Sequence, residues 1–196
     1  MLSELHDYLY RLQPQGGIPL KGTGIVLGLL LVAAHLWAWR QAGAAKAFLK
    51  ELPRSYAWGV ALMTIDFVWA MMILMNMDMG EFHFLRRPFL TVVPLGYVGM
   101  LLYVKEFLAV RALGGLLLLA AGPVLAAAFL QPPVTRLLLP LLAYVWIFVG
   151  MFLVGMPFLL RDWVSWAVAK ESRWKACVWG GIIYGALMAV LAVTTY

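Results

Sequence analysis

Long apolar segments alternate with short polar connections along most of this chain. About 20 mostly apolar residues are enough for a helix to cross the hydrocarbon core of a bilayer. Six segments have this character, and they are 22–39, 56–76, 88–104, 112–130, 137–160 and 174–195. The third is short for a span, and the fifth is long enough to tilt. The pattern therefore predicts an all-α integral membrane protein with six transmembrane helices.

The first, third and fifth connections between these segments resemble one another. Each contains Lys-Glu, then a basic residue, and then a glycine at the start of the next segment. The three stretches are "LKELPRSYAWG" (49–59), "VKEFLAVRALGG" (104–115) and "AKESRWKACVWGG" (169–181). Because internal repeats are common in membrane transporters, the sequence predicts three antiparallel hairpins related by a weak threefold repeat. Chance similarity between short basic loops is the alternative explanation.

Leucines recur at helical spacing near the start of the chain, at Leu2, Leu5, Leu9 and Leu12. A short helix with one apolar face lies in the plane of the membrane interface. Pro14 and the glycines that follow it end this pattern. The sequence therefore predicts an interfacial amphipathic segment over residues 1–21, followed by a transmembrane domain over residues 22–196.

The composition agrees with a protein that is solvated by lipid. Hydrophobic residues make up 64% of the chain and charged residues 12%, whereas a soluble domain has about 25% charged residues. The net charge of +6 does not indicate a nucleic-acid partner, because the basic residues lie between the apolar segments. Cys177 is the one cysteine of the chain, which excludes an intrachain disulfide and a CxxC metal or redox motif.

The basic residues also predict the orientation, because loops rich in Lys and Arg face the cytoplasm. Ten of them lie in the first, third and fifth connections: Arg40, Lys46, Lys50, Arg54, Lys105, Arg111, Arg161, Lys170, Arg173 and Lys175. Five lie on the opposite side: Arg11, Lys21, Arg86, Arg87 and Arg136. Both termini are therefore expected on the exterior or periplasmic side. The abundance of Leu, Ala, Gly and Trp is typical of proteins of a bacterial inner membrane.

Asp66 is the main candidate for chemistry within a span. It lies ten residues into the second segment, about 15 Å along the helix at a rise of about 1.5 Å per residue. A carboxylate at this depth is costly unless it is paired, protonated or hydrated, so we expect it to face the interior of the helix bundle. It is a candidate ion, proton or ligand site. The alternative is a hydrogen-bonded Asp that holds helices together.

His35 is the candidate partner of Asp66. It lies in the first segment, five residues before Arg40, and we expect the first two helices to be adjacent and the two side chains to differ in depth by about one turn. A His–Asp pair can relay protons or bind a cation. A lone His can instead bond a backbone carbonyl or ligate haem. Because no other predicted span contains a histidine, haem held by two intramembrane histidines is not expected, and the sequence identifies no cofactor.

The stretch "NMDMGEFHFLRR" (76–87) is the polar turn between the second and third segments. Its candidate metal ligands are Met75, just before the turn, and Met77, Met79 and His83 within it. Thioether sulfur favours Cu(I), and His can complete such a site. Methionine is also a common gap-filler in packed interiors, which is the simpler explanation.

The same turn carries four charged residues, and they are Asp78, Glu81, Arg86 and Arg87. We expect these side chains to pair with one another, to bind lipid headgroups or to contact a partner protein. The turn is therefore predicted to be an ordered, charge-paired connection on the exterior side of the membrane.

No known catalytic motif stands out. The chain has no Gly-x-Ser-x-Gly, no His-Glu-x-x-His and no P-loop, which favours a non-catalytic protein. The first hypothesis is an integral or accessory subunit of a larger membrane assembly, in contact with lipids and with other subunits or with copies of itself. The alternative is a small transporter or channel for a proton, cation or metal, using Asp66 with His35. An enzyme acting on a lipid or quinone would need a catalytic group that the sequence does not reveal.

Overall fold

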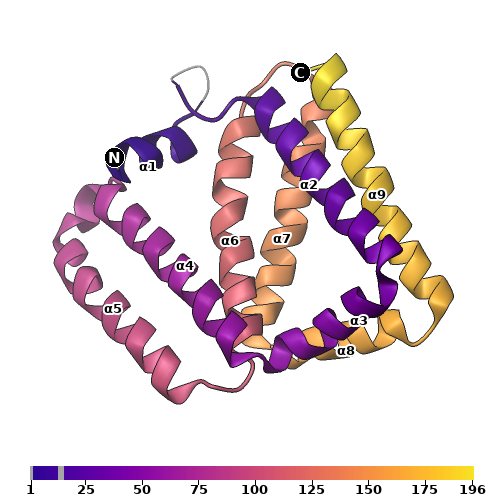
Figure 1. Ribbon diagram of the computed structural model, residues 1–196. Coiled ribbons are helices and arrows are strands. Elements are labelled where there is room, and N and C mark those ends of the chain that lie inside the picture. Colours follow the sequence, from indigo (N-terminus) through magenta and orange to yellow (C-terminus); the bar gives the residue numbers. More distant parts are fainter. Residues whose placement is uncertain (1, 13–15) are drawn as a thin grey trace.

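The computed structural model describes residues 2–12 and 16–196, and every regular element in these residues is a helix. The predicted helix end at Pro14 lies outside the described residues. The α-helices are α1 (Leu2–Tyr10), α2 (Leu20–Arg40), α3 (Ala42–Glu51), α4 (Tyr56–Asn76), α5 (Arg86–Tyr103), α6 (Leu108–Ala128), α7 (Leu138–Gly155), α8 (Phe158–Val168) and α9 (Glu171–Thr194). Short 3₁₀ helices are η1 (Leu52–Arg54), η2 (Gly80–Leu85) and η3 (Val134–Leu137) (Figure 1). The all-α prediction is confirmed.

Five of the described helical segments are long and apolar enough to cross a membrane, and they are α2, α4, α6, Val134–Gly155 (η3 with α7) and α9. These segments fit an integral membrane protein. α5 is not among them, because Arg86 and Arg87 begin it and Pro94 interrupts its apolar residues. Five of the six predicted spans are therefore found, and the predicted third span, 88–104, is not confirmed.

The predicted fifth span is wrong in its length. The sequence predicts one helix over 137–160, but α7 ends at Gly155 and α8 begins at Phe158. Pro157 lacks a backbone N–H and disfavours a helical conformation in the residue before it. Met156 accordingly adopts φ −128° and ψ 69°, and the chain turns there. α8 then crosses the end of the long helices instead of extending α7 (Figure 1).

Two of the predicted loops contain helices. α3 and α8 contact each other and lie across one end of the long helices (Figure 1), which we call the α3/α8 end. Lys46 of α3 donates a hydrogen bond to Glu171 Oε2 at the start of α9, at 2.7 Å. The same ammonium lies 5.2 Å from the centre of a Trp174 ring. These contacts hold α3 against the beginning of α9.

The closest helix pairs are not the predicted hairpins. α2 packs along α9, α6 packs along both α7 and α4, and α5 packs mainly along α4. α2 and α9 are the first and the last of the long helices, so their contact brings the two ends of the chain's long-helix region together (Figure 1). The three hairpins between consecutive spans are therefore not confirmed.

The threefold repeat is not confirmed either, because the three similar stretches have different local structures. Residues 49–59 contain the end of α3, η1 and the start of α4. Residues 104–115 turn at Phe107, whose φ is 56°, before α6 begins. Residues 169–181 lie almost entirely in α9. The shared residues do not specify a shared turn.

Glycines bring the backbones of the main helix pairs into direct contact. A Cβ atom added at Gly28 of α2 would lie 2.7 Å from the Gly185 carbonyl oxygen of α9, and one at Gly185 would lie 2.8 Å from that of Gly28. A Cβ atom added at Gly114 of α6 would lie 2.8 Å from the Gly150 carbonyl oxygen of α7, and one at Gly150 would lie 2.8 Å from that of Gly114. Small residues allow this close approach in membranes, where packing and not hydrophobicity brings helices together. Four glycines therefore determine the two tightest helix contacts.

α1 confirms the predicted N-terminal helix, and it packs against α4 and α6. The Tyr10 hydroxyl accepts a hydrogen bond from the Trp69 indole N–H of α4 at 2.9 Å, and its ring lies against Gly122 of α6. Burial raises the pKa of Tyr10 above its ordinary value of 10.0, so this hydroxyl stays neutral. The leucines that line a cavity of about 420 Å³ against α4 are Leu2, Leu5 and Leu9. The apolar face of α1 therefore covers part of α4.

We expect Gly28→Val to destabilise the protein, because the new side chain meets backbone atoms of α9 that cannot move aside. Overpacking of this kind costs about 1–3 kcal/mol. The measurement is the thermal unfolding midpoint in a mild detergent. Gly180→Ala is the control, because a Cβ atom at Gly180 meets nothing within 4 Å and alanine is the better helix former. An unchanged midpoint for Gly28→Val would contradict a close α2–α9 contact.

Candidate functional site

Asp66 is the one charged side chain that is buried among the described residues, with 8% of its surface exposed. It lies in the middle of α4 and faces α6, where a Cβ atom at Gly115 would lie 2.7 Å from Asp66 Oδ2. Two turns earlier, Gly59 of α4 lies against Ala109 of α6. A Cβ atom added at Gly59 would lie 2.9 Å from the Ala109 backbone nitrogen. Gly59 thus lets α4 approach α6 closely, and Gly115 makes room for the carboxyl group.

α5 covers the other side of this part of α4. The Thr64 hydroxyl donates a hydrogen bond to the Val60 carbonyl at 2.7 Å, and its oxygen lies 2.9 Å from the Tyr97 hydroxyl of α5. The rings of Phe67 and Tyr97 stack with their centres 4.5 Å apart. Asp66 and these two rings line a cavity of about 370 Å³ between α4, α5 and α6. Three helices therefore contribute to the Asp66 cavity.

The Asp66 carboxyl group has no hydrogen-bond or ion-pair partner among the described residues. Its Oδ1 atom is buried and forms no hydrogen bond with any residue that the structure describes. An unpartnered carboxyl group in an apolar environment is destabilising. Apart from Asp66 and Tyr97, the side chains that line the cavity are apolar. The arrangement suits a proton, a small cation or a single hydrogen-bond donor on a ligand, held by one carboxyl group.

His35 lies at the contact between α2 and α9. Its Nδ1 atom is 2.8 Å from the Leu31 carbonyl oxygen, so Nδ1 carries a proton and donates it to that oxygen. Its ring lies against Gly181 of α9, where any Cβ atom would overlap the imidazole. His35 also lines an apolar cavity of about 530 Å³ between α2, α3, α8 and α9. The bond to Leu31 and the packing on Gly181 match the lone-histidine alternative.

The structure does not bring His35 and Asp66 together. The expected pairing assumed that the first two spans are neighbours, but α2 packs on α9 and α4 packs on α6. α3 and η1 occupy the connection between α2 and α4 and separate them. The two side chains line different cavities. The expected His35–Asp66 pair is therefore not formed, and the two side chains occupy separate positions.

The polar turn before α5 is ordered by backbone contacts and not by charge pairs. Asp78 Oδ1 accepts a hydrogen bond from the Gly80 N–H at 2.9 Å, and Gly80 has a φ of 48°. Arg86 donates a hydrogen bond to the Met77 carbonyl. Among the described residues, neither of the two acids pairs with either of the two arginines, so the predicted charge pairing is wrong. The four side chains concerned are Asp78, Glu81, Arg86 and Arg87.

The candidate copper ligands lie at the end of α4, in the turn that follows it and in η2. Met75 is in the last turn of α4 and is 52% exposed, and Met77 follows it at 36%. Met79 precedes η2, and His83 lies within η2 with its side chain exposed. In residues 2–12 and 16–196, no three His, Cys, Asp or Glu side chains form a metal-binding group. Copper binding at the thioethers stays a prediction.

The residues near Asp66 could not be identified from the sequence. Gly115, Thr64 and Tyr97 come from three different helices. The signal for Gly115 is present in the sequence as the Gly-Gly pair at 114–115, near the start of a span. Thr64 precedes Asp66 by two residues, yet its contact with Tyr97 depends on how α4 and α5 pack. Only the tertiary arrangement identifies these neighbours.

No protein-family model, curated protein or solved structure matches this chain. Its function is therefore inferred from its own residues and geometry.

We expect Asp66→Leu to stabilise the protein, because it replaces an unpartnered buried carboxyl group with an apolar side chain of similar size. The removed penalty for an unsatisfied polar group is about 1–3 kcal/mol. The measurement is the free energy of unfolding in mixed micelles. Asp66→Asn, which keeps a polar group, is the control and should change stability less. A strongly destabilised Asp66→Leu would show that the carboxyl group has a partner in the membrane.

Proposed function

We propose that this protein is a non-catalytic integral subunit of a larger membrane assembly, and that α5 is the helix that contacts the partner. The observation that carries the proposal is the pair Gly96 and Gly99 in α5. A Cβ atom added at either glycine meets nothing within 4 Å. Small residues on a membrane helix permit close contact with another helix, and no described helix of this chain lies against these two.

The other glycines within the long helices differ from Gly96 and Gly99. Most of them lie against a neighbouring helix or side chain, with a built Cβ atom no more than 3 Å from the nearest neighbouring atom. These are Gly24, Gly28, Gly59, Gly114, Gly115, Gly122, Gly150, Gly181 and Gly185. Gly96 and Gly99 also lie well inside a long helix, but no described atom lies within 4 Å of a Cβ atom built on either of them. By analogy with the internal contacts, they suit a helix from another chain.

The remaining surface of α5 supports the same proposal. No residue of α5 is buried, and its outward side chains include Leu95 and Leu102, at 66% and 59% exposure. With Arg86, Arg87 and Pro94, α5 is less suited than the other long helices to face lipid on every side. A partner helix would cover it, and α5 would then be the sixth membrane span.

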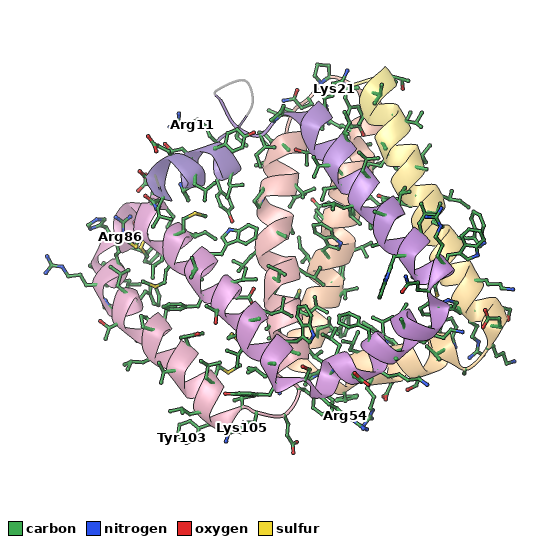
Figure 2. All side chains as sticks on the ribbon, in the orientation of Figure 1. Arg11, Lys21, Arg54, Arg86, Tyr103 and Lys105 are labelled. Carbon is green, nitrogen blue, oxygen red and sulfur yellow. The ribbon has the colours of Figure 1, made fainter. Side chains whose placement is uncertain are left out.

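We also propose an orientation of the protein in the membrane. Figure 2 shows Arg54 and Lys105 at the α3/α8 end, and Arg11, Lys21 and Arg86 towards the opposite end. The basic residues favour the α3/α8 end by ten to five, and such an excess is typical of the cytoplasmic side. We therefore place the α3/α8 end in the cytoplasm and both termini on the exterior or periplasmic side of a bacterial inner membrane.

We expect Gly96→Leu combined with Gly99→Leu to release the protein from its assembly. The new side chains fill the space that a partner helix needs, and their Cβ atoms meet nothing within 4 Å among the described residues. The measurement is native mass spectrometry of the tagged protein after gentle extraction from its own membranes. Wild-type protein should appear with stoichiometric partner subunits, and the variant should appear at the mass of its own tagged chain, without them.

Gly180→Leu is the matched control for this experiment. Gly180 is an open glycine in α9, so Gly180→Leu adds one leucine, half the apolar bulk of the double variant, at a site away from α5. The control should retain the partners. If wild-type protein is recovered alone at high yield, or if the control loses the partners as completely as the α5 variant, the proposed role of α5 is wrong.

A second candidate function is a proton or cation pathway that uses Asp66 without His35. The unpartnered, buried Oδ1 atom favours it. Asp66→Asn in sealed proteoliposomes should then abolish flux of a proton or of Na⁺ driven by an imposed gradient. His35→Gln should leave that flux unchanged, because His35 lines another cavity. Flux that persists in Asp66→Asn would exclude this function.

A further inference from the structure

A basic pocket lies at the α3/α8 end, apart from the Asp66 cavity and from α5. Its volume is about 260 Å³. Lys50 at the end of α3, Arg54 of η1, and Arg161 and Ser165 of α8 supply its polar lining. Phe107 also lines it, one residue before α6 begins. The pocket therefore gathers three cations in one place, near the start of α6.

No acidic side chain lines this pocket, although Arg161 pairs with one beside it. Lys50 and Arg54 form no hydrogen bond or ion pair with the residues that the structure describes. Arg161 bonds to the adjacent Asp162 at 3.0 Å, and both side chains are about half exposed. Asp162 itself does not line the pocket, and neither do Glu51 and Glu106, the acids next to Lys50 and Phe107 in sequence. The pocket thus suits an anion.

An apolar cavity of about 530 Å³ adjoins the basic pocket. Leu49 and Val164 line both the basic pocket and this cavity. The large rings that line the cavity are Trp37, Trp163, Trp166 and Trp174. Its lining reaches along α2 to Ala34, six residues before the end of that helix at Arg40, which is about 9 Å along the helix axis. A basic pocket and an apolar cavity that extends into the span are therefore direct neighbours.

We infer that these two spaces bind one anionic phosphate-bearing lipid, with its phosphate among Lys50, Arg54 and Arg161 and a hydrocarbon chain in the apolar cavity. Arg and Lys form strong charge-assisted hydrogen bonds with phosphate oxygens. Basic pockets between membrane helices on the cytoplasmic side bind acidic lipid headgroups. The apolar cavity, at about 530 Å³, is within the usual range of volumes for small-molecule binding.

The position of the two spaces fits a lipid better than a free anion. α3 and α8 cross the ends of the long helices, at the depth where headgroups lie if those helices span the bilayer (Figure 1). Cation–π contacts hold two of the rings at this end, with Lys46 over Trp174 and the Arg173 guanidinium 4.7 Å from the centre of a Trp166 ring. The tryptophans thus form an ordered apolar wall behind the basic pocket.

The first test measures headgroup selection. Purified protein is equilibrated in micelles with equal amounts of dioleoyl phosphatidylglycerol and dioleoyl phosphatidylcholine, and bound lipids are counted by native mass spectrometry. Wild-type protein should retain one phosphatidylglycerol at least tenfold more often than phosphatidylcholine. Arg54→Gln combined with Arg161→Gln should lower this retention at least tenfold.

Lys105→Gln combined with Lys175→Gln is the matched control. It removes the same charge from the same end of the molecule, from two exposed lysines that do not line the pocket. Its retention of phosphatidylglycerol should stay within twofold of wild type. If the pocket variant unfolds at a lower temperature than wild type, Lys50→Gln combined with Arg161→Gln replaces it. Equal losses in pocket and control variants would overturn the proposal.

The second test separates a lipid from a free phosphate. Ala167→Trp fills the apolar cavity, which Ala167 lines, without touching the basic pocket. It should reduce retention of dioleoyl phosphatidylglycerol at least fivefold and leave that of the short-chain dihexanoyl lipid unchanged. Full displacement of the long-chain lipid by millimolar inorganic phosphate, with no effect of Ala167→Trp, would show a phosphate site only and would overturn the lipid assignment.

Discussion

The close approach of helix backbones at glycines is the constraint on which this structure depends. Lipid chains solvate apolar side chains as well as protein does, so helices in a bilayer gain little by hiding leucines from one another. Gly28 against Gly185 and Gly114 against Gly150 instead allow backbone contact, with built Cβ atoms 2.7–2.8 Å from the facing carbonyl oxygens. α6 is central because it meets α7 at Gly114 and α4 at Gly115. α5 has no such contact through its own glycines and lies at the edge.

This constraint also explains how a carboxyl group is accommodated within the bundle. Asp66 faces α6 at a position where any residue larger than glycine would displace it. The tight contact at Gly59 keeps α4 close to α6 at one end, while α5 encloses the other side through Thr64 and Tyr97. Among the described residues, no polar group forms a hydrogen bond with Oδ1. A residue that served only to join helices would be expected to form a hydrogen bond with one of them.

Local features of the fold could be predicted from the sequence, and the pairing of helices could not. The bounds of α4 match the predicted 56–76, because Ser55 caps its first turn and the turn with Asp78 and Gly80 follows its end. α7 is shorter than predicted because Pro157 ends an apolar run that composition alone does not divide. The contact of α2 with α9 joins residues that are far apart in the chain, and no periodicity indicates it. For the same reason Asp66 could be singled out from its depth, whereas its neighbours and its separation from His35 could not.

The two ends of the molecule differ in how tightly its helix pairs meet, and this difference accounts for the apolar cavity. At the end opposite α3 and α8, a core that includes Leu20, Ala121, Leu139 and Met188 joins α2 and α9 to α6 and α7. At the α3/α8 end the same pairs diverge, and α3 and α8 lie between them (Figure 1). Short amphipathic helices cannot fill that widening space to its full depth, so a cavity remains above them. In water such a void would favour collapse of its walls. In a bilayer a hydrocarbon chain can occupy it, so the divergence of the helices and the binding of a lipid stabilise each other.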